Sequence, residues 1–555
     1  MKEREFIDIH CHSVMTHYRN PEIKKSAGEE IESKVIGFID TLFGKETMRS
    51  YVTQSDFGKL AHGNVKAVMI SFYPIERKWY LPKTNAPIVK DALISSITGF
   101  SRQNLVKLMK EKEANYFADL VNEYKYLLSQ VDKKYSGKKF KIATNYTEYA
   151  KNAQSGDTVS VIISIEGGHS LGSLSIPDLD KKPEFVMVED YYQKFRKNVY
   201  KLKKWGPNSD GTHTPLYITL SHHFWNMLAG HCESLMFIFN QSIGKETGLT
   251  DAGREMIEDL LSDENEEGVP NKSRRVLIDV KHMSPLARKQ FYLFLAKRKK
   301  NTGLNIPIIC SHASIGDAPE LNCFIKGTEE EKKFKTPNNY FNTTTLSLND
   351  EDIKEIVDSD GLIGIILHEK RIAGKNALKK EPYKVNQKRK IMDELQNEIE
   401  RLQFELQNTQ DLKRKNQLVG QISRNNSKRL LRMKEIMEAY ICMIMANIYR
   451  IVEVSGEKGW DHVCLGSDFD GTINKLDFLG TSEKLPMLTE MMLAFMNNPQ
   501  DLDKFNKKWT KKYLKTLHFG AKPEILIDKF SNKNVDAFLK KYFTEDYLVK
   551  GVNPV

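Results

Sequence analysis

Eight short runs of apolar, mostly β-branched residues recur along the chain, and polar residues follow each of them. The runs occupy residues 5–10, 65–73, 159–166, 216–222, 275–282, 306–312, 361–367 and 461–468. Their length and composition predict buried β-strands. Segments with helical periodicity, such as 104–130 and 250–261, lie between most of them. Strands that alternate with helices predict parallel βα units, which form either a closed (β/α)8 barrel or a doubly wound open sheet.

The residues at the ends of these runs favour the barrel. Six of the eight runs end in or near His, Glu or Asp, namely at His10 and His12, Glu166, His222, His282, His312 and Asp468. In a barrel all strand carboxyl ends meet at one mouth, whereas in an open sheet they spread along an edge. The predicted fold is therefore an α/β protein, a (β/α)8 TIM barrel with helical insertions.

The first run carries three polar residues on one face. Side chains alternate across a strand, so Asp8, His10 and His12 are expected to point the same way. Three polar groups on a buried face are costly unless a hydrogen-bond network or a metal ion satisfies them. Imidazole and carboxylate groups are the ligands of Zn²⁺ and related divalent metals. An HxH pattern alone leaves both explanations open.

The 555 residues are expected to form a single barrel with long insertions. Residues 14–64 and 74–150 lengthen the first two connections, and residues 480–555 are expected to form helices that close the barrel bottom. Residues 383–440 are charged and mostly helical, with Leu395, Ile399, Leu402 and Leu406 at heptad spacing. Residues 417–437 are expected to return antiparallel to this helix. The resulting hairpin would be a dimerisation arm or an active-site cover, or else a surface elaboration packed on its own barrel, which is slightly favoured.

Charge and composition narrow the expected partners and location. The formal net charge is 84 − 73 = +11, and much of the excess lies in lysine runs at 295–300 and 375–390 that are typical of solvated surface. No basic–aromatic motif indicates a nucleic-acid partner. No apolar run approaches the roughly 20 residues that cross a bilayer, and the first residues lack a signal-peptide core. Six cysteines without a CxxC pair suit a reducing compartment. We expect a cytoplasmic protein with no membrane or nucleic-acid partner, and a homodimer stays open.

Several motifs together resemble one known family. The stretches are SIEGGHSLG (164–172), YITLSHHFWN (217–226), GLTDAGREMI (248–257), LIDVKHMS (277–284), PIICSHAS (307–314) and LGSDFDG (465–471). In order and spacing they resemble the membrane (renal) dipeptidase family of zinc metallopeptidases, which has an amidohydrolase-type barrel. The resemblance runs from residue 5 to about residue 471 and leaves the insertions unmatched.

The resemblance implies a binuclear zinc site, with another divalent metal as an alternative. The metal ligands that it implies are His10, His12, Glu166, His282 and His312, with Glu166 bridging the two ions. It implies that Asp468 handles the proton of the attacking water and that His222 contacts the substrate. A water bridging two cations loses its proton near neutral pH. Asp8 is expected to orient a ligand.

Three departures from the family pattern concern the metal and the substrate. The family has HxD on the first strand, whereas His12 here removes one negative charge and leaves the identity of the metal open. The family's substrate-binding arginine after the sixth-strand histidine has no counterpart in 311–342, where Lys326 is one replacement. Residues 222–231 depart from the family just after the histidine, so we expect a rebuilt substrate pocket.

Three functions are therefore open. The first is a zinc-dependent dipeptidase, and the second is a related amidohydrolase that cleaves another amide, a cyclic amide or an ester. The third is an inactive scaffold that binds a partner through the helical insertion. The other residues near the motifs are expected to be structural: His169, His223 and His231 as supports, Asp470 in a turn, and Cys11, Cys310 and Cys464 in packing.

Overall fold

Eight parallel strands close into a barrel in the computed structural model, which describes residues 4–31, 52–80, 113–175, 188–235, 239–245, 247–334 and 339–554. The strands are β1 (Phe6–Cys11), β2 (Val65–Phe72), β6 (Thr158–Glu166), β8 (Tyr217–Thr219), β9 (Leu277–Asp279), β10 (Ile309–Ala313), β11 (Leu362–Ile365) and β12 (Val463–Leu465). Each pairs in parallel with the next along the chain, and β12 returns to β1. The predicted (β/α)8 barrel is confirmed, because an open sheet would leave two unpaired edges.

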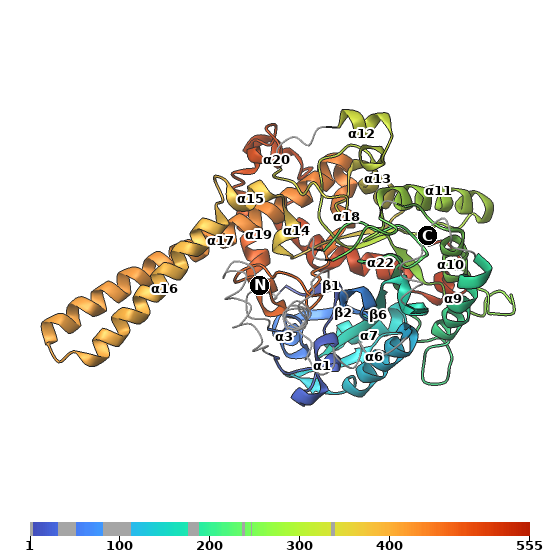
Figure 1. The fold of residues 1–555 in the computed structure, drawn as a ribbon, viewed down its shortest axis with the longest axis horizontal. Helices are drawn as coiled ribbons and strands as arrows, with labels where there is room; N and C mark the ends of the chain where they lie inside the picture. Colours follow the sequence, from blue (N-terminus) through green and yellow to red (C-terminus); the bar gives the residue numbers. More distant parts are fainter. Residues whose placement is uncertain are drawn as a thin grey trace.

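Helices follow most barrel strands and surround the sheet (Figure 1). After β1 to β9 they are α1 (Met15–Arg19), α3 (Phe57–His62), α6 (Tyr116–Gln130), α7 (Tyr146–Ser155), α9 (Val188–Lys203), α10 (Asp251–Leu261) and α11 (Pro285–Thr302). After β10 and β11 they are α12 (Glu329–Lys333), α13 (Asp350–Asp358), α14 (Glu369–Ile372), α15 (Lys375–Lys379), α16 (Val385–Asn408), α17 (Leu412–Ser455) and α18 (Gly459–His462). After β12 they are α19 (Leu485–Asn497), α20 (Lys511–Thr516), α21 (Pro523–Asp528), α22 (Asn534–Tyr542) and α23 (Glu545–Leu548).

Local sequence signals set several of these helix ends. Thr250 caps α10 by accepting a hydrogen bond from the backbone N–H of Gly253. Ser284 caps α11 in the same way, and Pro285 occupies the first helical position. Gly303 ends α11 in the left-handed conformation, at φ 71°. The helix over 250–261 therefore follows its predicted range closely.

The insertions after β1 and β2 are described only in part. Residues 32–51 and 81–112 lie outside the described residues, and so does the start of the helix predicted over 104–130. The described part after β2 adds the hairpin of β4 (Lys134–Tyr135) and β5 (Lys138–Ile142), whose second strand pairs with β6. It also adds β3 (Glu113–Asn115), which pairs with β7 (Ser173–Ser175).

The insertion after β11 forms an antiparallel pair of long helices that extends away from the barrel (Figure 1). We call residues 385–434, α16 with the first half of α17, the helical arm. Ile399 and Leu402 are buried, and Leu395 and Leu406 are half-buried. The heptad positions are therefore used within the hairpin. From Ile436 onward α17 is largely buried, because it packs against α13, α19 and β11.

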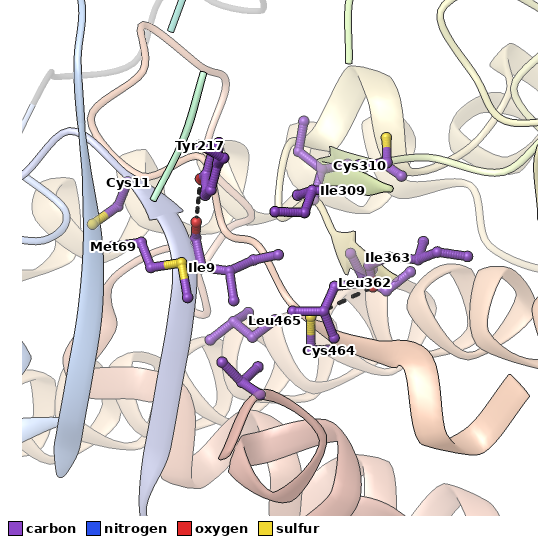
Figure 2. Packing of buried hydrophobic residues seen from close by; sticks show 14 of the residues in the cluster. Ile9, Cys11, Met69, Tyr217, Ile309, Cys310, Leu362, Ile363, Cys464 and Leu465 are labelled. Carbon is purple, nitrogen blue, oxygen red and sulfur yellow. Dashed lines mark hydrogen bonds between the residues drawn. The ribbon is translucent and has the colours of Figure 1, made fainter. Parts of the chain in front are cut away.

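The core is continuous from the strands to the surrounding helices. Figure 2 shows Ile9 of β1, Ile309 of β10 and Leu465 of β12 in one apolar cluster, to which Cys310 also belongs with its side chain directed away from these three. The residues after β12 reach the opposite end of the barrel from the strand carboxyl ends. There the Asn532 amide donates to the Glu5 carbonyl, and the Asn534 amide donates to the carbonyls of Trp460 and Val463. These contacts hold the C-terminal helices to the first residues of β1 and β12.

Two further observations concern the whole described chain. Among the described residues, no helix combines the length and the apolarity needed to cross a membrane. All six cysteines are unpaired and buried.

Candidate metal centre and its surroundings

The seven predicted site residues all lie at the carboxyl ends of barrel strands. Their side chains come from six strands or from the residues directly after them, and all seven are buried: His10, His12, Glu166, His222, His282, His312 and Asp468. Two of the seven, His282 at φ 66° and Asp468 at φ 61°, have left-handed backbone. Such a conformation is uncommon outside glycine. The fold therefore gathers residues that are up to 458 positions apart at one mouth.

Glu166, the last residue of β6, is the centre of this cluster. The Nε2 atoms of four histidines surround its Oε1 atom, at 3.6 Å for His10 and 3.4 Å for His222. The corresponding distances are 3.5 Å for His282 and 3.4 Å for His312. The other carboxylate oxygen, Oε2, lies 3.1 Å from Nε2 of His12. Both oxygens of Glu166 thus face imidazole nitrogens.

These separations fit ligands that share a metal ion. With bonds of about 2.1 Å, two ligands of one tetrahedral Zn²⁺ lie about 3.4 Å apart. The donor atoms form two such triads with Glu166 in common, one with His10 and His12 and one with His282 and His312. Nε2 of His282 lies 3.3 Å from Nε2 of His312. Among the described residues, Nε2 of His10 and both ring nitrogens of His12 have no hydrogen-bond partner. Orphaned buried nitrogens are costly, and a shared cation would satisfy them.

Burial sets the charge of most of the histidines. Burial lowers the pKa of His10, lowers that of His282 to about 3, and together with the charge of His10 holds that of His312 well below its ordinary value. Neutral imidazole is the form that binds a metal. Burial alone would raise the pKa of Glu166, but the charge of His222 and contacts with His10 and His12 hold it well below the ordinary value. Burial therefore favours the neutral imidazole form of His10, His282 and His312 beside the Glu166 carboxylate.

His12 differs from the other histidines. Burial alone would lower its pKa, but the close contact with Glu166 and the negative charge of that residue raise it above the ordinary value. A proton or a metal ion on Nε2 of His12 would each be attracted by Glu166. The His12 position is thus suited to a cation even though it lacks the carboxylate of the family pattern.

The sequence analysis missed Glu76, which holds His222. The Nδ1 atom of His222 lies 2.8 Å from Oε2 of Glu76. Glu76 also accepts hydrogen bonds from the Tyr73 hydroxyl and from the backbone N–H of Phe224. Burial alone would raise the pKa of Glu76, but His222 lowers it to about 2. Burial would likewise lower the pKa of His222, but Glu166 and Glu76 raise it to about 10. The only signal in the sequence is the place of Glu76 just beyond the second strand.

Asp468 lies beside the first triad and forms a further possible triad with His10 and His312. Its Oδ1 atom is 3.9 Å from Nε2 of His10 and 3.8 Å from Nε2 of His12. Burial, followed by the charge of Glu166, raises the pKa of Asp468 well above its ordinary value. Asp8 contacts backbone instead of a ring. It accepts hydrogen bonds from the N–H groups of His10 and Ser467 and from the Ser467 hydroxyl, and so ties β1 to the loop that carries Asp468.

Three other histidines lie around the site. His169 and His231 contact backbone carbonyls, and His223 lies beside the cluster. His169 contacts the carbonyl of Pro74 at 2.7 Å, and His231 lies against the carbonyls of Cys232 and Ile243. The His223 ring lies against that of His222, tilted by 43° with 3.8 Å between ring centroids, and His223 forms a further possible triad with His222 and His282. Asp470 accepts from the N–H groups of Gln54 and Ser55 and fixes a loop beside the mouth.

Arg371, and not the expected Lys326, interacts electrostatically with Asp468 of the cluster. Lys326 is exposed after the 3₁₀ turn Leu321–Phe324, which packs on α11 in the outer helical ring. Arg371 of α14 is half-buried, donates to the carbonyl of Ser234, and interacts electrostatically with Asp468. Burial lowers the pKa of Arg371 and the charge of Asp468 counteracts this effect. Arg371 thus follows the seventh strand of the barrel, β11, instead of the sixth.

Fold and cluster together define the class of this protein, a (β/α)8 barrel with a histidine–carboxylate site for metal at its mouth. The sequence of residues 338–516 matches the family model of membrane dipeptidase (peptidase family M19). This match confirms the resemblance that the motifs indicated, and it supports a metallopeptidase function. Of the seven site residues only Asp468 falls within the match, so the histidine cluster is a separate observation.

The similarity of this chain to other known proteins is distant. No curated protein matches the chain in sequence. Solved structures that resemble it include dipeptidase AC, a metallopeptidase, at 13% identity and a TM-score of 0.46, covering 98% of this chain and 99% of the other. A metallopeptidase from Rhodobacter sphaeroides, liganded with a phosphinate mimic of the dipeptide L-Ala-D-Ala, has 13% identity and a TM-score of 0.47 over 97% and 99%. An amidohydrolase from Pseudomonas aeruginosa has 12% identity and a TM-score of 0.40 over 87% and 91%.

Proposed function

We propose that this protein is a metal-dependent hydrolase of the membrane dipeptidase type that cleaves the amide bond of a dipeptide. The observation that carries the proposal is the convergence of four Nε2 atoms on Oε1 of Glu166, at 3.4 to 3.6 Å. Three of the four, those of His10, His282 and His312, have the spacing of ligands that share an ion with Glu166. The family match over residues 338–516 supports the same function.

Two zinc ions are the proposed cofactors, with another divalent metal as the alternative. His10, His12 and Glu166 would hold one ion, and Glu166, His282 and His312 the other. When bound, such ions polarise the scissile carbonyl and lower the pKa of water. The ring of His10 is oriented by the Tyr217 hydroxyl at 3.2 Å and that of His312 by the Ser311 hydroxyl at 2.8 Å. These contacts leave Nε2 of each ring directed at Glu166.

Asp468 and His222 are the proposed catalytic residues. Oδ1 of Asp468 lies close to the first triad, and its raised pKa lets it take up a proton and return it to the leaving nitrogen. His222 donates from Nδ1 to Glu76, so a proton on Nε2 makes it a cation directed at the cluster. A cation in this position stabilises negative charge that develops on the substrate oxygen.

Arg371 is the proposed partner of a substrate carboxylate. Its half-buried guanidinium interacts electrostatically with Asp468, and a guanidinium binds a carboxylate through two parallel hydrogen bonds. The lack of an arginine after the His312 strand favours a second candidate, an amidohydrolase that acts on another amide, a cyclic amide or an ester.

A metal analysis combined with a substrate panel tests the proposal. The purified protein is stripped with a chelator, reloaded with Zn²⁺, Mn²⁺ or Co²⁺, and assayed on dipeptides, including ones with a D-residue, and on N-acyl amino acids and lactones. We expect dipeptide hydrolysis that is lost on stripping and restored by metal. Hydrolysis of N-acyl or lactone substrates alone would favour the second candidate. Metal-loaded protein that is inactive on every substrate would contradict both and favour the scaffold hypothesis.

A further inference from the structure

The tip of the helical arm carries the two most exposed large apolar side chains among the described residues. Phe404, near the end of α16, is 70% exposed, and Leu412, the first residue of α17, is 76% exposed. Val419, Leu430 and Leu431 of α17 are also more than half exposed. Leu412, Val419 and Leu430 are spaced by 7 and 11 residues and therefore lie along one line of the helix. Figure 1 shows that this tip is the part of the arm farthest from the barrel.

The same part of α17 is strongly basic. Residues 412–434 contain eight Lys or Arg and no Asp or Glu. Three of the eight have acidic neighbours: Arg414 pairs with Glu405, Arg432 with Glu435, and Lys434 with Glu438. Lys413, Arg424 and Lys428 are exposed, and within the described residues no carboxylate pairs with them. Their spacings of 11 and 4 residues place them on a line next to the apolar one.

A second copy of this chain does not fit this surface well. The seam of the hairpin is already filled from within, by Ile399 and Leu402 against α17. The α16 helix has four basic and five acidic residues, so its net charge of −1 cannot neutralise the +8 of residues 412–434 in another copy. The excess positive charge instead calls for a strongly anionic partner.

Nucleic acid and an anionic membrane are the two common partners of this kind. Phosphate groups of a nucleic acid would neutralise the charge and a base could stack on Phe404, but the exposed leucine and valine side chains would gain no partner. Lys and Arg beside exposed apolar residues are typical of helices that lie in the interface of an anionic bilayer. A peripheral contact of this kind needs no spanning helix, so it is compatible with the finding that no described helix can cross a membrane.

We propose that the helical arm docks this protein on anionic membrane surfaces, with Phe404 and Leu412 inserted at the tip and Lys413, Arg424 and Lys428 facing lipid headgroups. The sequence analysis expected no membrane partner because it considered only spanning segments. This inference is independent of the proposed hydrolytic function, since none of these residues lies near the metal centre.

Vesicle flotation of the full-length protein tests the inference. The probe is vesicles in which about a third of the lipid is phosphatidylserine, compared with pure phosphatidylcholine. We expect flotation only with the anionic vesicles, weakened by added salt. Each basic residue near such a surface contributes about a fivefold gain in binding. The variant K413Q/R424Q/K428Q should therefore bind at least about tenfold more weakly.

Two further variants separate the contributions. The matched control removes the same charge from exposed lysines elsewhere, as K297Q/K300Q/K333Q, and should float like the wild type. F404S/L412S should keep the salt-dependent part of binding but lose about tenfold in affinity where salt screens the charges. Unchanged melting temperatures show that the variants remain folded.

Three results would overturn the inference. The first is no flotation with anionic vesicles, and the second is equal loss of flotation in the arm variant and in the matched control. The third is preferential binding of an RNA or DNA oligonucleotide that F404S/L412S leaves unchanged, which would identify the arm as a nucleic-acid surface.

Discussion

Nδ1 of His222 lies 2.8 Å from Oε2 of Glu76, and this contact joins the loop after β2 to the loop after β8. The tyrosine hydroxyl of Tyr73 and the backbone N–H of Phe224 bind the same carboxylate, so its position is fixed from three sides. Because Nδ1 of His222 is engaged, only Nε2 is free to face the cluster, 3.4 Å from Oε1 of Glu166. Glu76 therefore fixes the orientation of the His222 ring and favours its protonated form.

Replacing Glu76 with Gln should lower kcat about 10- to 100-fold with a smaller change in KM. Its charge helps to raise the pKa of His222 to about 10, so His222 stays protonated up to that pH in the wild type. Without the charge this pKa falls, and the alkaline loss of activity should begin at lower pH. Steady-state kinetics from pH 6 to 10 measure both effects. Y73F removes a neutral hydrogen bond to the same carboxylate and should leave the pH profile unchanged. A wild-type profile in E76Q would contradict the role of His222 as a cation.

Replacing Arg371 with Met should raise KM about tenfold or more for dipeptides with a free C-terminal carboxylate, because a charge-assisted bidentate contact is lost. The amidated forms of the same dipeptides should be affected little. K326M is the control, since Lys326 lies in an exposed turn. If R371M raises KM equally for both substrate forms, or if K326M has the larger effect, Arg371 does not bind the carboxylate.

Replacing Asp468 with Asn should reduce kcat by about 10²- to 10⁴-fold, the usual contribution of a general acid–base group. The metal content should stay the same even though Asp468 also forms a possible triad with His10 and His312, because both triads that contain Glu166 are kept. D470N is the comparison: Asp470 binds the backbone of Gln54 and Ser55, so its loss should lower stability more than kcat. A D468N protein that is fully active, or inactive only because it lacks metal, would assign Asp468 another role.

Replacing Glu123 with Gln should change how stability depends on pH. Glu123 is fully buried on α6, and burial raises its pKa to about 7. The folded state then binds more protons than the unfolded state between about pH 4.5 and 7, so wild-type stability should fall over this interval as pH rises. The gap of about 2.5 units corresponds to about 3 kcal/mol. Denaturant unfolding at pH 5 and 8 should show this loss in the wild type and not in E123Q, and parallel curves would contradict it.

The sequence predicted the barrel because its strands are short and apolar and alternate with helices, and all eight runs become barrel strands. Parallel strands also forced the residues at their ends to one mouth, which is why His10 and Asp468, far apart in sequence, lie 3.9 Å apart. Glu76 and Arg371 could not be predicted in this way. Glu76 lies in the loop after β2 and Arg371 in the four-residue helix α14, both too short for a periodic pattern to set the direction of a side chain, and only the packed structure brings them toward the cluster.

The packing of the helical arm also could not be predicted from the sequence. Its heptad spacing predicted a helical seam but not which helix would fill it, since a partner chain and the returning helix offer the same apolar surface. The net charge of the whole chain also does not reveal that eight basic residues lie together in 412–434. The structure places them on a segment that extends away from the barrel. The cytoplasmic location stays a prediction of the sequence.

Anomalous diffraction from crystals of the metal-loaded protein tests the metal centre most directly. Two peaks are predicted, about 3.5–4 Å apart, one among His10, His12 and Glu166 and the other among Glu166, His282 and His312. Crystals grown with an excess of metal that show no peak beside Glu166, or peaks bound only by surface residues, would contradict the metal centre and the hydrolase built on it.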